Sequence, residues 1–177
     1  MNILKGIRKV DDVIKGLLDF ASPKEPVLTL VSVNAVLEEA LFISAPQAQE
    51  SQITIEKNLG KALPLVLLDQ EQIKRVFINI ILNAFQAMHP GGVLRIRTAR
   101  SPGDRVMVRI KDSGAGIPPA VLKRIFDPFF TTKSQGAGLG LSISRTILEK
   151  HHATITCDSQ EGKGTTFTIL FRARPAS

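Results

Sequence analysis

The most informative stretch of this sequence is Ile125-Phe-Asp-Pro-Phe-Phe-Thr-Thr-Lys-Ser-Gln-Gly-Ala-Gly-Leu-Gly-Leu141. Residues 126–138, rich in Phe, Thr and Gly, are predicted to form a long loop. A loop of about a dozen residues without regular structure is uncommon unless it is a lid or a binding loop. We expect Phe126 and Phe129 to pack at the base of this loop. Lys133 is the natural positive charge there for a phosphate.

The second half of this stretch, Gly136 to Leu141, opens directly into a helix predicted at residues 139–150. Glycine-rich backbone at a helix N-terminus favours anions, because free N–H groups and the helix dipole both attract negative charge. The stretch lacks the Gly-x4-Gly-Lys-Ser/Thr of a Walker loop. Its glycine order also differs from the Rossmann fingerprint, and no βαβ unit surrounds it. It therefore predicts a phosphate site of another kind.

Two further glycine motifs lie on either side of this stretch. Upstream, a predicted strand ends in Asp112-Ser-Gly-Ala-Gly-Ile-Pro118, which places a carboxylate beside backbone that can approach a ligand closely. Such a carboxylate can accept a hydrogen bond from an adenine amino group. Downstream, Gly162-Lys-Gly-Thr-Thr-Phe167 joins two predicted strands. Taken alone, each motif is also explained by an ordinary turn next to a strand.

A long helix predicted at residues 70–88 carries an apolar stripe and a polar stripe. Asn79 and Asn83 interrupt a very apolar stretch, although Asn is a mediocre helix former. The polar stripe either faces solvent or lines a pocket, where an Asn carbonyl oxygen suits Mg²⁺. Its members are Gln72, Arg75, Asn79, Asn83 and Gln86.

The periodicity of the rest of the chain predicts an α/β fold, a two-layer α/β sandwich in which three main helices cover a mixed sheet. Cys157 alternates with Ala153 and Ile155 and is expected to be a small buried side chain. Strands are expected at residues 27–31, 52–57, 63–68, 93–99, 105–111, 153–158 and 165–171, helices at 33–49, 70–88 and 139–150, and one or two helical turns at 118–124.

Composition narrows the class of protein. The formal net charge is +7, but Lys and Arg are spread along the chain and there is no Trp or Tyr for base stacking. We therefore expect a solvated basic surface that attracts ATP or an acidic partner, with no nucleic acid bound and no membrane contact. A single cysteine fits a reducing compartment. No run of about 18 consecutive apolar residues and no signal peptide is apparent, so we expect a cytoplasmic location, compatible with a membrane-anchored full-length protein.

The order of the motifs over residues 27–172 resembles the catalytic and ATP-binding domain of sensor histidine kinases, within the gyrase, Hsp90, histidine kinase and MutL superfamily. Asn79-x3-Asn83 resembles the N box, and Asp112-x-Gly-x-Gly116 resembles the box that binds adenine. Residues 126–133 look like the F box and lid, especially those of nitrogen-regulation-type kinases. Residues 136–141 and 162–165 look like the second and third glycine boxes.

This resemblance implies a kinase domain with ATP and Mg²⁺ as cofactors. Asn83 would hold the metal, and Asn79 and Lys133 would be the catalytic residues. Many members carry Lys or Arg and then Tyr where this chain has Gln86 and Ala87, so Lys133 is expected to bear more of the phosphate contact. The implied cofactor-binding residues are Asn79, Asn83, Gln86, Asp112, Gly114, Gly116, Ile117, Phe130, Thr131, Thr132, Lys133, Gly136, Gly138, Leu139, Gly140, Leu141 and Thr165.

The phosphoacceptor motif of the family, a His followed by an acidic residue and Asn/Thr-Pro, is absent. We interpret His89, His151 and His152, which lie near helix ends, as structural. The implied partners are a histidine-containing dimerisation domain and a response regulator.

Residues 1–24 resemble the C-terminal part of a dimerisation helix, and residues 27–174 the catalytic domain. A heptad seam at residues 3–21 would allow a homodimer, or would pack on its own domain. Two other functions stay open. One is an ATPase like gyrase or MutL, which carry a Glu where this chain has Asn79. The other is a non-catalytic nucleotide-binding module.

Overall fold

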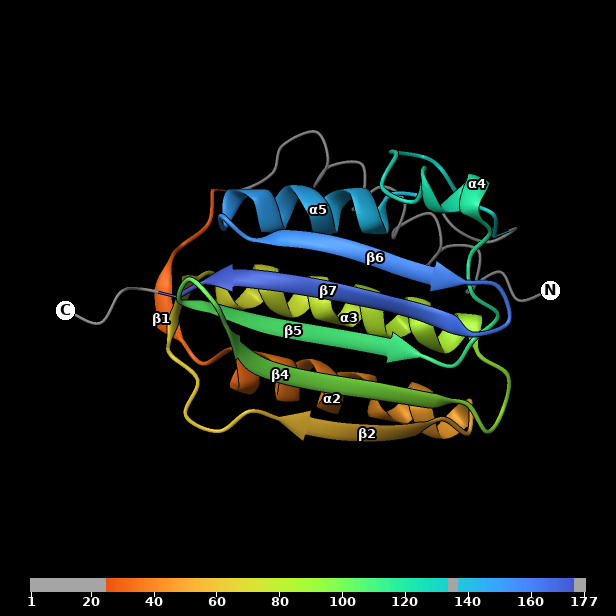
Figure 1. The fold of residues 1–177 in the computed structure, drawn as a ribbon, viewed down its shortest axis with the longest axis horizontal. Helices are drawn as coiled ribbons and strands as arrows, with labels where there is room; N and C mark the ends of the chain where they lie inside the picture. The colour runs from red at the N-terminus through yellow and green to blue at the C-terminus, as the bar shows by residue number, and fades with distance from the viewer. Residues whose placement is uncertain (1–24, 134–136, 174–177) are drawn as a thin grey trace, which may run out of the picture.

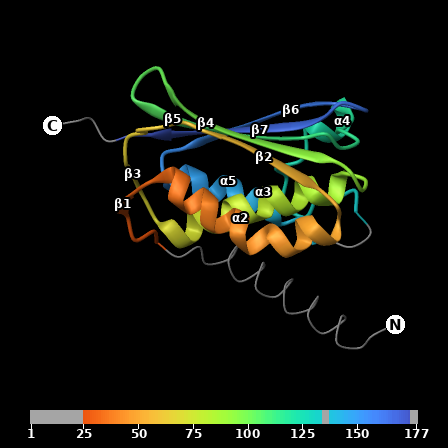
Figure 2. The same ribbon diagram turned by 90° about the horizontal axis from the view of Figure 1, so that it is seen from below.

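The computed structural model describes residues 25–133 and 137–173. A five-stranded sheet lies in one layer, and three long helices cover one of its faces (Figures 1 and 2). This is the predicted two-layer α/β sandwich. The elements are β1 (Thr29–Val31), α2 (Val33–Glu50), β2 (Thr54–Leu59), β3 (Val66–Leu68), α3 (Gln70–Ala87), β4 (Val93–Ser101), β5 (Arg105–Asp112), α4 (Pro119–Leu122), α5 (Gly140–Lys150), β6 (Thr154–Gln160) and β7 (Gly164–Arg172).

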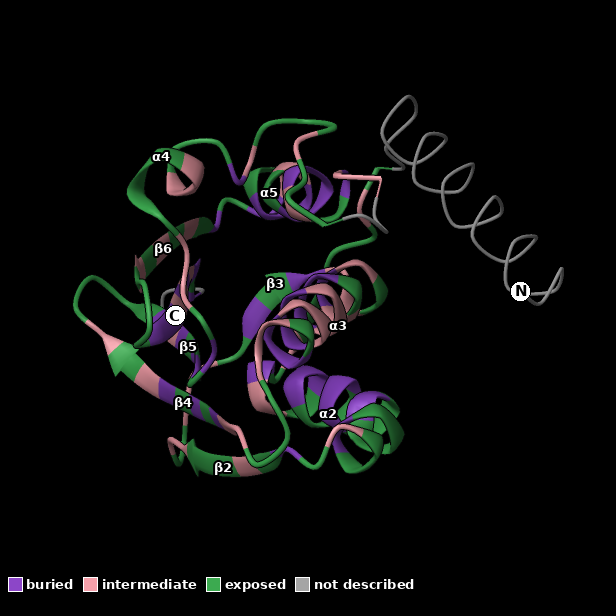
Figure 3. Ribbon diagram, turned by 90° about the vertical axis from the view of Figure 1, so that its right-hand side faces the viewer, coloured by how far each residue is buried: buried purple, intermediate pink, exposed green. Residues whose placement is uncertain are grey.

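The sheet is mixed, with the strand order β2-β4-β5-β7-β6. β2 pairs with β4 in parallel, and the other neighbours are antiparallel. Alternate side chains of the central strands are buried against the helices, as the purple bands in Figure 3 show. Ile96, Ile110 and Phe167 form one such buried row, because the register places them side by side. The opposite face of the sheet carries mostly polar and charged side chains.

α3 is the central helix of the second layer. Its apolar stripe is fully buried, and the rings of Phe77 and Phe171 meet edge to face with centroids 6.2 Å apart. Asp69 caps the helix, since its side chain accepts from the backbone N–H of Gln72 at 3.0 Å. The same carboxylate accepts from the backbone N–H of Val27 at 3.0 Å. The chain that leads into the domain is therefore bonded to the start of α3.

The structure differs from the prediction at β1 and β3. These strands do not join the main sheet but pair with each other as a separate two-stranded antiparallel sheet. Each has three residues, and Pro64 interrupts the predicted strand at 63–68 because it has no N–H to give to a ladder. An isolated bridge between Val66 and Ala173 joins this small sheet to the end of β7.

The proposed heptad seam and dimerisation helix lie in residues 1–24, outside the described residues. Within the described ranges, no helix is both long enough and apolar enough to cross a membrane. Cys157 packs against the core as expected, and burial raises the pKa of its thiol to about 12. The thiol is therefore protonated and unreactive at neutral pH.

Candidate functional site

One cavity of about 760 Å³ lies between α3, α5 and the loop that joins α4 to α5. Every cofactor-binding residue predicted from the sequence lines this cavity except Gly114 and Gly136. Gly136 lies outside the described residues. The predicted residues that meet here are Asn79, Asn83, Gln86, Asp112, Gly116, Ile117, Phe130, Thr131, Thr132, Lys133, Gly138, Leu139, Gly140, Leu141 and Thr165.

α3 contributes a row of three amides, Asn79, Asn83 and Gln86, to one wall. The Nδ2 of Asn79 donates to Ser144 Oγ on α5 at 3.0 Å, and the Nδ2 of Asn83 approaches Asn79 Oδ1 at 3.4 Å. These contacts fix the direction of each amide. The carbonyl oxygen of Asn83 is thereby directed to a cation. The polar stripe lines a pocket, which was one of its two interpretations.

Lys133 reaches from the loop to this row of amides. Its Nζ donates to Asn83 Oδ1 at 2.7 Å and to Gln86 Oε1 at 2.6 Å. Burial lowers the pKa of Lys133, because desolvation disfavours the ammonium. The two carbonyl dipoles replace part of the lost hydration. Gln86, which stands where the family pattern has a basic side chain, thus holds a basic side chain from another element.

Asp112 ends β5 and is buried, with 4% of its surface exposed. Its Oδ1 accepts from the backbone N–H groups of Gly114 at 2.8 Å and Thr165 at 3.1 Å. Burial raises the pKa of this carboxyl, and the two backbone donors oppose the rise. Because Oδ1 takes both backbone bonds, Oδ2 is left for a donor in the cavity.

The N-terminus of α5 opens into the same cavity. Its N-cap residue, Leu139, offers no side-chain acceptor to the first turn, so the first N–H groups and the helix dipole can serve an anion. A Cβ at Gly140 would collide with the amide oxygen of Asn79. A residue with a Cβ here would displace the Asn79 amide, which is bonded to Ser144.

Two arginines stack on the aromatic loop. The guanidinium carbon of Arg124 lies 4.3 Å from the ring centroid of Phe130, and that of Arg145 lies 5.8 Å from Phe126. Phe126 packs against the core, as expected. The same expectation is wrong for Phe129, which is 59% exposed. Its φ of +64° turns the chain in the left-handed region and accompanies this exposure.

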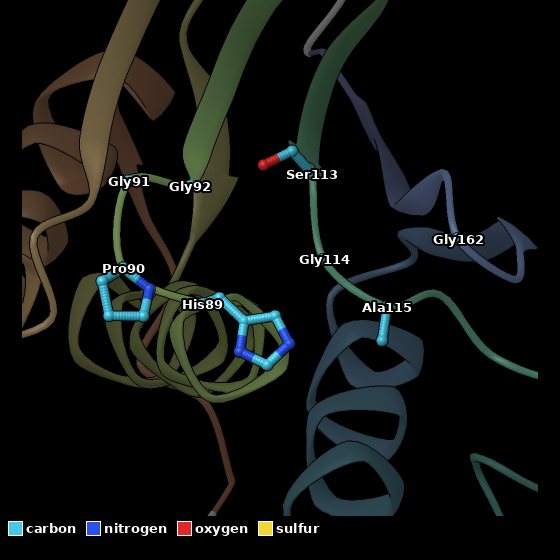
Figure 4. Close-up of a pocket in the computed structure, with 8 residues that line it drawn as sticks. All are labelled: His89, Pro90, Gly91, Gly92, Ser113, Gly114, Ala115 and Gly162. Atoms are coloured by element: carbon cyan, nitrogen blue, oxygen red, sulfur yellow. The ribbon is translucent and has the colours of Figure 1, made fainter.

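Gly114 lies behind the carboxylate of Asp112, in the wall of a second cavity of about 420 Å³ (Figure 4). The ring of His89 extends from the end of α3 towards Ala115 across this second cavity. A Cβ at Gly114 would lie 2.5 Å from the carbonyl oxygen of Ala87. Gly114 therefore supports Asp112 through its backbone and does not line the main cavity.

Sequence reasoning missed several residues of the main cavity. Arg75 was recognised as a member of the polar stripe, one turn before Asn79, but was not assigned to the site. The apolar lining comes from segments distant in sequence, so no local pattern marks it. These further lining residues are Ala84, Ala87, Ala115, Pro118, Val121, Ile125, Ala137, Ile143 and Phe167.

None of the three histidines lines the main cavity among the described residues. His151 is buried, and both ring nitrogens are engaged: Nε2 accepts from the N–H of Asp69 at 3.0 Å, and Nδ1 lies 2.7 Å from the carbonyl oxygen of Ile147. Nδ1 therefore carries the proton. His151 links the end of α5 to the start of α3, which is a structural role.

Comparison with known proteins identifies the family. Residues 68–175 match the family described as histidine kinase-, DNA gyrase B- and HSP90-like ATPases. The chain belongs to this family. Within it, the relatives are sensor kinases: the signal transduction histidine-protein kinase AtoS of Escherichia coli K12 is 36% identical over 173 residues. That match covers 98% of this chain but only 28% of AtoS, so the chain spans less than a third of that relative.

Solved structures of this family agree with the fold. The catalytic domain of histidine kinase ThkA is 31% identical with a TM-score of 0.74, covering 82% of this chain and 95% of that one. ThkA in complex with the response regulator TrrA gives a TM-score of 0.81 at 25% identity, covering 98% and 50%. Full-length ShkA in complex with AMPPNP gives a TM-score of 0.82 at 25% identity, covering 93% of this chain and 36% of ShkA. The chain is thus an ATP-binding catalytic domain of the sensor histidine kinase type.

Proposed function

We propose that this domain binds Mg·ATP in the 760 Å³ cavity and donates the γ-phosphate to a histidine on a dimerisation domain. One observation carries the proposal: a buried carboxylate, a lysine ammonium and an open helix N-terminus line one cavity. A carboxylate suits the amino group of a base, and an ammonium and a helix N-terminus suit phosphates. We place this activity in the cytoplasm, where ATP is available.

Each end of the cavity has a chemical task in this proposal. Oδ2 of Asp112 accepts from the adenine amino group, and apolar side chains such as Ile117 and Phe167 flank the base. The first N–H groups of α5 and the ammonium of Lys133 bind the phosphate oxygens. Asn83 Oδ1 would hold Mg²⁺, which neutralises phosphate charge when bound. Catalysis is then positioning and electrostatic stabilisation, as in phosphoryl transfer generally.

The cavity chemistry favours transfer over hydrolysis. Asp112 is the one carboxylate among the described lining residues, and it is committed to the end assigned to adenine. Asn79 stands where gyrase-like ATPases carry a Glu, and its amide already donates to Ser144. An amide cannot take a proton from water usefully, so the described lining residues position no general base beside the phosphates.

The acceptor histidine lies elsewhere in this proposal. His151 is buried with both ring nitrogens engaged, and His89 lines a different cavity. A nucleophilic imidazole must be accessible and near a base. We propose that residues 1–24 are the end of a dimerisation helix that pairs through residues 3–21, that residues 27–174 are the catalytic domain, and that a response regulator receives the phosphate afterwards.

The test is transfer from γ-labelled ATP to a separately supplied dimerisation domain that carries the acceptor histidine. We expect acid-labile label on that domain with the wild-type chain and a large loss with Asn83→Ala. Phosphate released equally without the acceptor would instead identify an ATPase. Tight ATP binding with neither transfer nor release would identify a non-catalytic nucleotide-binding module.

A further inference from the structure

The outer face of the five-stranded sheet, turned toward the viewer in Figure 1 and away from the helices in Figure 2, concentrates positive charge that the nucleotide site does not use. The register places Arg97 directly opposite Arg109, and Arg95 directly opposite Lys111. Residues opposite each other share a face of the sheet. We call this outer face of the whole sheet the basic face. Its six exposed cations are Arg95, Arg97, Arg105, Arg109, Lys111 and Arg172.

The basic face is poorly neutralised by the protein itself. Glu56 on β2 pairs with Arg95 at 2.7 Å. Within the described ranges, no acidic side chain lies within ion-pair distance of Arg97, Arg109 or Lys111. Like charges directly opposite each other destabilise a sheet. An anionic occupant would relieve this repulsion.

An apolar row crosses the basic face between two rows of arginines. Ala99 of β4 lies opposite Met107 of β5, which lies opposite Leu170 of β7. All three side chains are partly exposed. A small apolar centre with a rim of arginines is the composition of protein–protein interfaces, in which Met and Arg are enriched.

The other anionic surfaces fit this face less well. The exposed side chains of the face include no aromatic residue on which the bases of a single strand could stack. In the part of the chain that the structure describes, no helix rises from this sheet surface to enter a duplex groove. The three side chains of its apolar row are partly buried in the sheet, which gives little apolar surface to insert into a bilayer. A second copy of this chain would bring the same net charge of +7 and repel it.

We propose that the basic face docks an acidic protein surface that presents a small apolar contact ringed by carboxylates. Arg97 and Arg109 provide the bidentate donors for those carboxylates, and Met107 and Leu170 provide the apolar contact. At about 4.8 Å per strand and 3.4 Å per residue, five strands of seven residues offer on the order of 600 Å² of planar area. That area approaches the roughly 800 Å² per partner of a standard interface.

The test uses the full 177-residue chain and a synthetic probe. The probe is an amphipathic helical peptide whose leucine stripe is flanked by glutamates, and its reference is the same peptide with the leucines replaced by serine. We expect the leucine peptide to bind more tightly and to weaken with added salt. Arg97→Gln with Arg109→Gln should weaken it by about tenfold or more. Met107→Ser with Leu170→Ser should reduce the affinity for the leucine peptide to the affinity that the wild-type chain has for the serine peptide.

The control is Lys61→Gln with Lys123→Gln, which removes the same charge from exposed positions outside the sheet and should change binding by no more than about twofold. Unchanged ATP binding in every variant verifies the fold independently, because the cavity lies on the other side of the sheet. Equal losses in the two charge variants would overturn the proposal. Peptide affinity that does not change in the Met107→Ser, Leu170→Ser variant would also overturn it. So would an arginine variant that loses binding only to duplex DNA or to phosphatidylglycerol vesicles tested in parallel.

Discussion

Asp112 illustrates how a single side chain is prepared for one ligand atom. Its Oδ1 is held by the N–H groups of Gly114 and Thr165, so Oδ2 alone is offered to the cavity. An asparagine would keep the same two bonds through its own oxygen. Its Nδ2 donor would then stand where Oδ2 was. The backbone thus dictates that only a carboxylate presents an acceptor here.

Asp112→Asn should therefore weaken ATP binding severely while the fold survives. Losing a charged hydrogen bond costs about 1.5–3 kcal/mol, which is roughly 10- to 150-fold in Kd, and the adenine amino group would meet a donor. Calorimetric titration of the folded variant with ATP measures this. Affinity equal to that of the wild type would remove Asp112 from the site.

The same substitution should not destabilise the domain at neutral pH. Burial raises the pKa of Asp112 above its ordinary 3.8. A raised pKa in the folded state gives stability that is full at low pH and is lost as pH rises through that raised pKa. The ionised carboxylate therefore opposes folding at pH 7. We expect Asp112→Asn to melt at the same or a higher temperature at pH 8, with the difference shrinking as the pH falls through the raised pKa. A wild-type advantage that grows with pH would contradict this.

Asn83 and Asn79 differ in what their oxygens meet. Asn83 Oδ1 accepts from the ammonium of Lys133, whereas Asn79 Oδ1 lies near the Nδ2 of Asn83. Asn83→Ala should abolish the Mg²⁺-dependent part of nucleotide binding more completely than Asn79→Ala does. Nucleotide titrations with and without Mg²⁺ separate the two. Equal losses of the Mg²⁺-dependent part would contradict the assignment of Asn83 as the ligand.

At the scale of elements, α3 and the loop before α5 form one unit through Lys133. The ammonium bridges two carbonyl oxygens of α3 across about 50 residues of sequence. The sequence predicted both elements from their local patterns, since helix periodicity and glycine-rich loops are local signals. It could not predict that Gln86 receives Lys133, because that contact depends on how the loop folds back over the helix.

Lys133→Met should loosen this loop. We expect faster amide exchange at residues 126–133 in the variant, with the α5 backbone unaffected, and weaker ATP binding because a phosphate contact is lost. The nucleotide AMPPNP should slow exchange in the loop of the wild type. The control is Lys123→Met, an exposed lysine just after α4. Equal, strong protection of the loop in all samples would refute its role as a lid.

At the scale of the molecule, helix and strand periodicity was enough to predict the two-layer fold, and the order of the motifs indicated the family. An Asn-x3-Asn helix, a strand ending in Asp and a glycine-led helix occur in one order that few folds share. The separate β1–β3 sheet could not be predicted, because three-residue strands contain too little pattern to show their partner. The exposure of Phe129 follows from a positive φ that Pro128-Phe129 does not reveal.

The whole chain should bind ATP without labelling itself. All described features of the ATP site are present, yet no histidine lines it. Incubation with γ-labelled ATP, followed by acid treatment, measures phosphohistidine on the chain. Strong acid-labile label that disappears when His89, His151 or His152 is replaced would show that the acceptor is in this chain.

The bonds at the start of α3 determine how force enters the domain. Val27 donates to Asp69, the cap of α3, and the N–H of Asp69 donates to His151 at the end of α5. Lys150 pairs with Glu25 at 2.8 Å. A force applied to the chain just before residue 25 would therefore act on α3 and α5 together, at one corner of the molecule. That corner therefore couples a displacement of the chain at residues 25–27 to the two long helices that line the cavity.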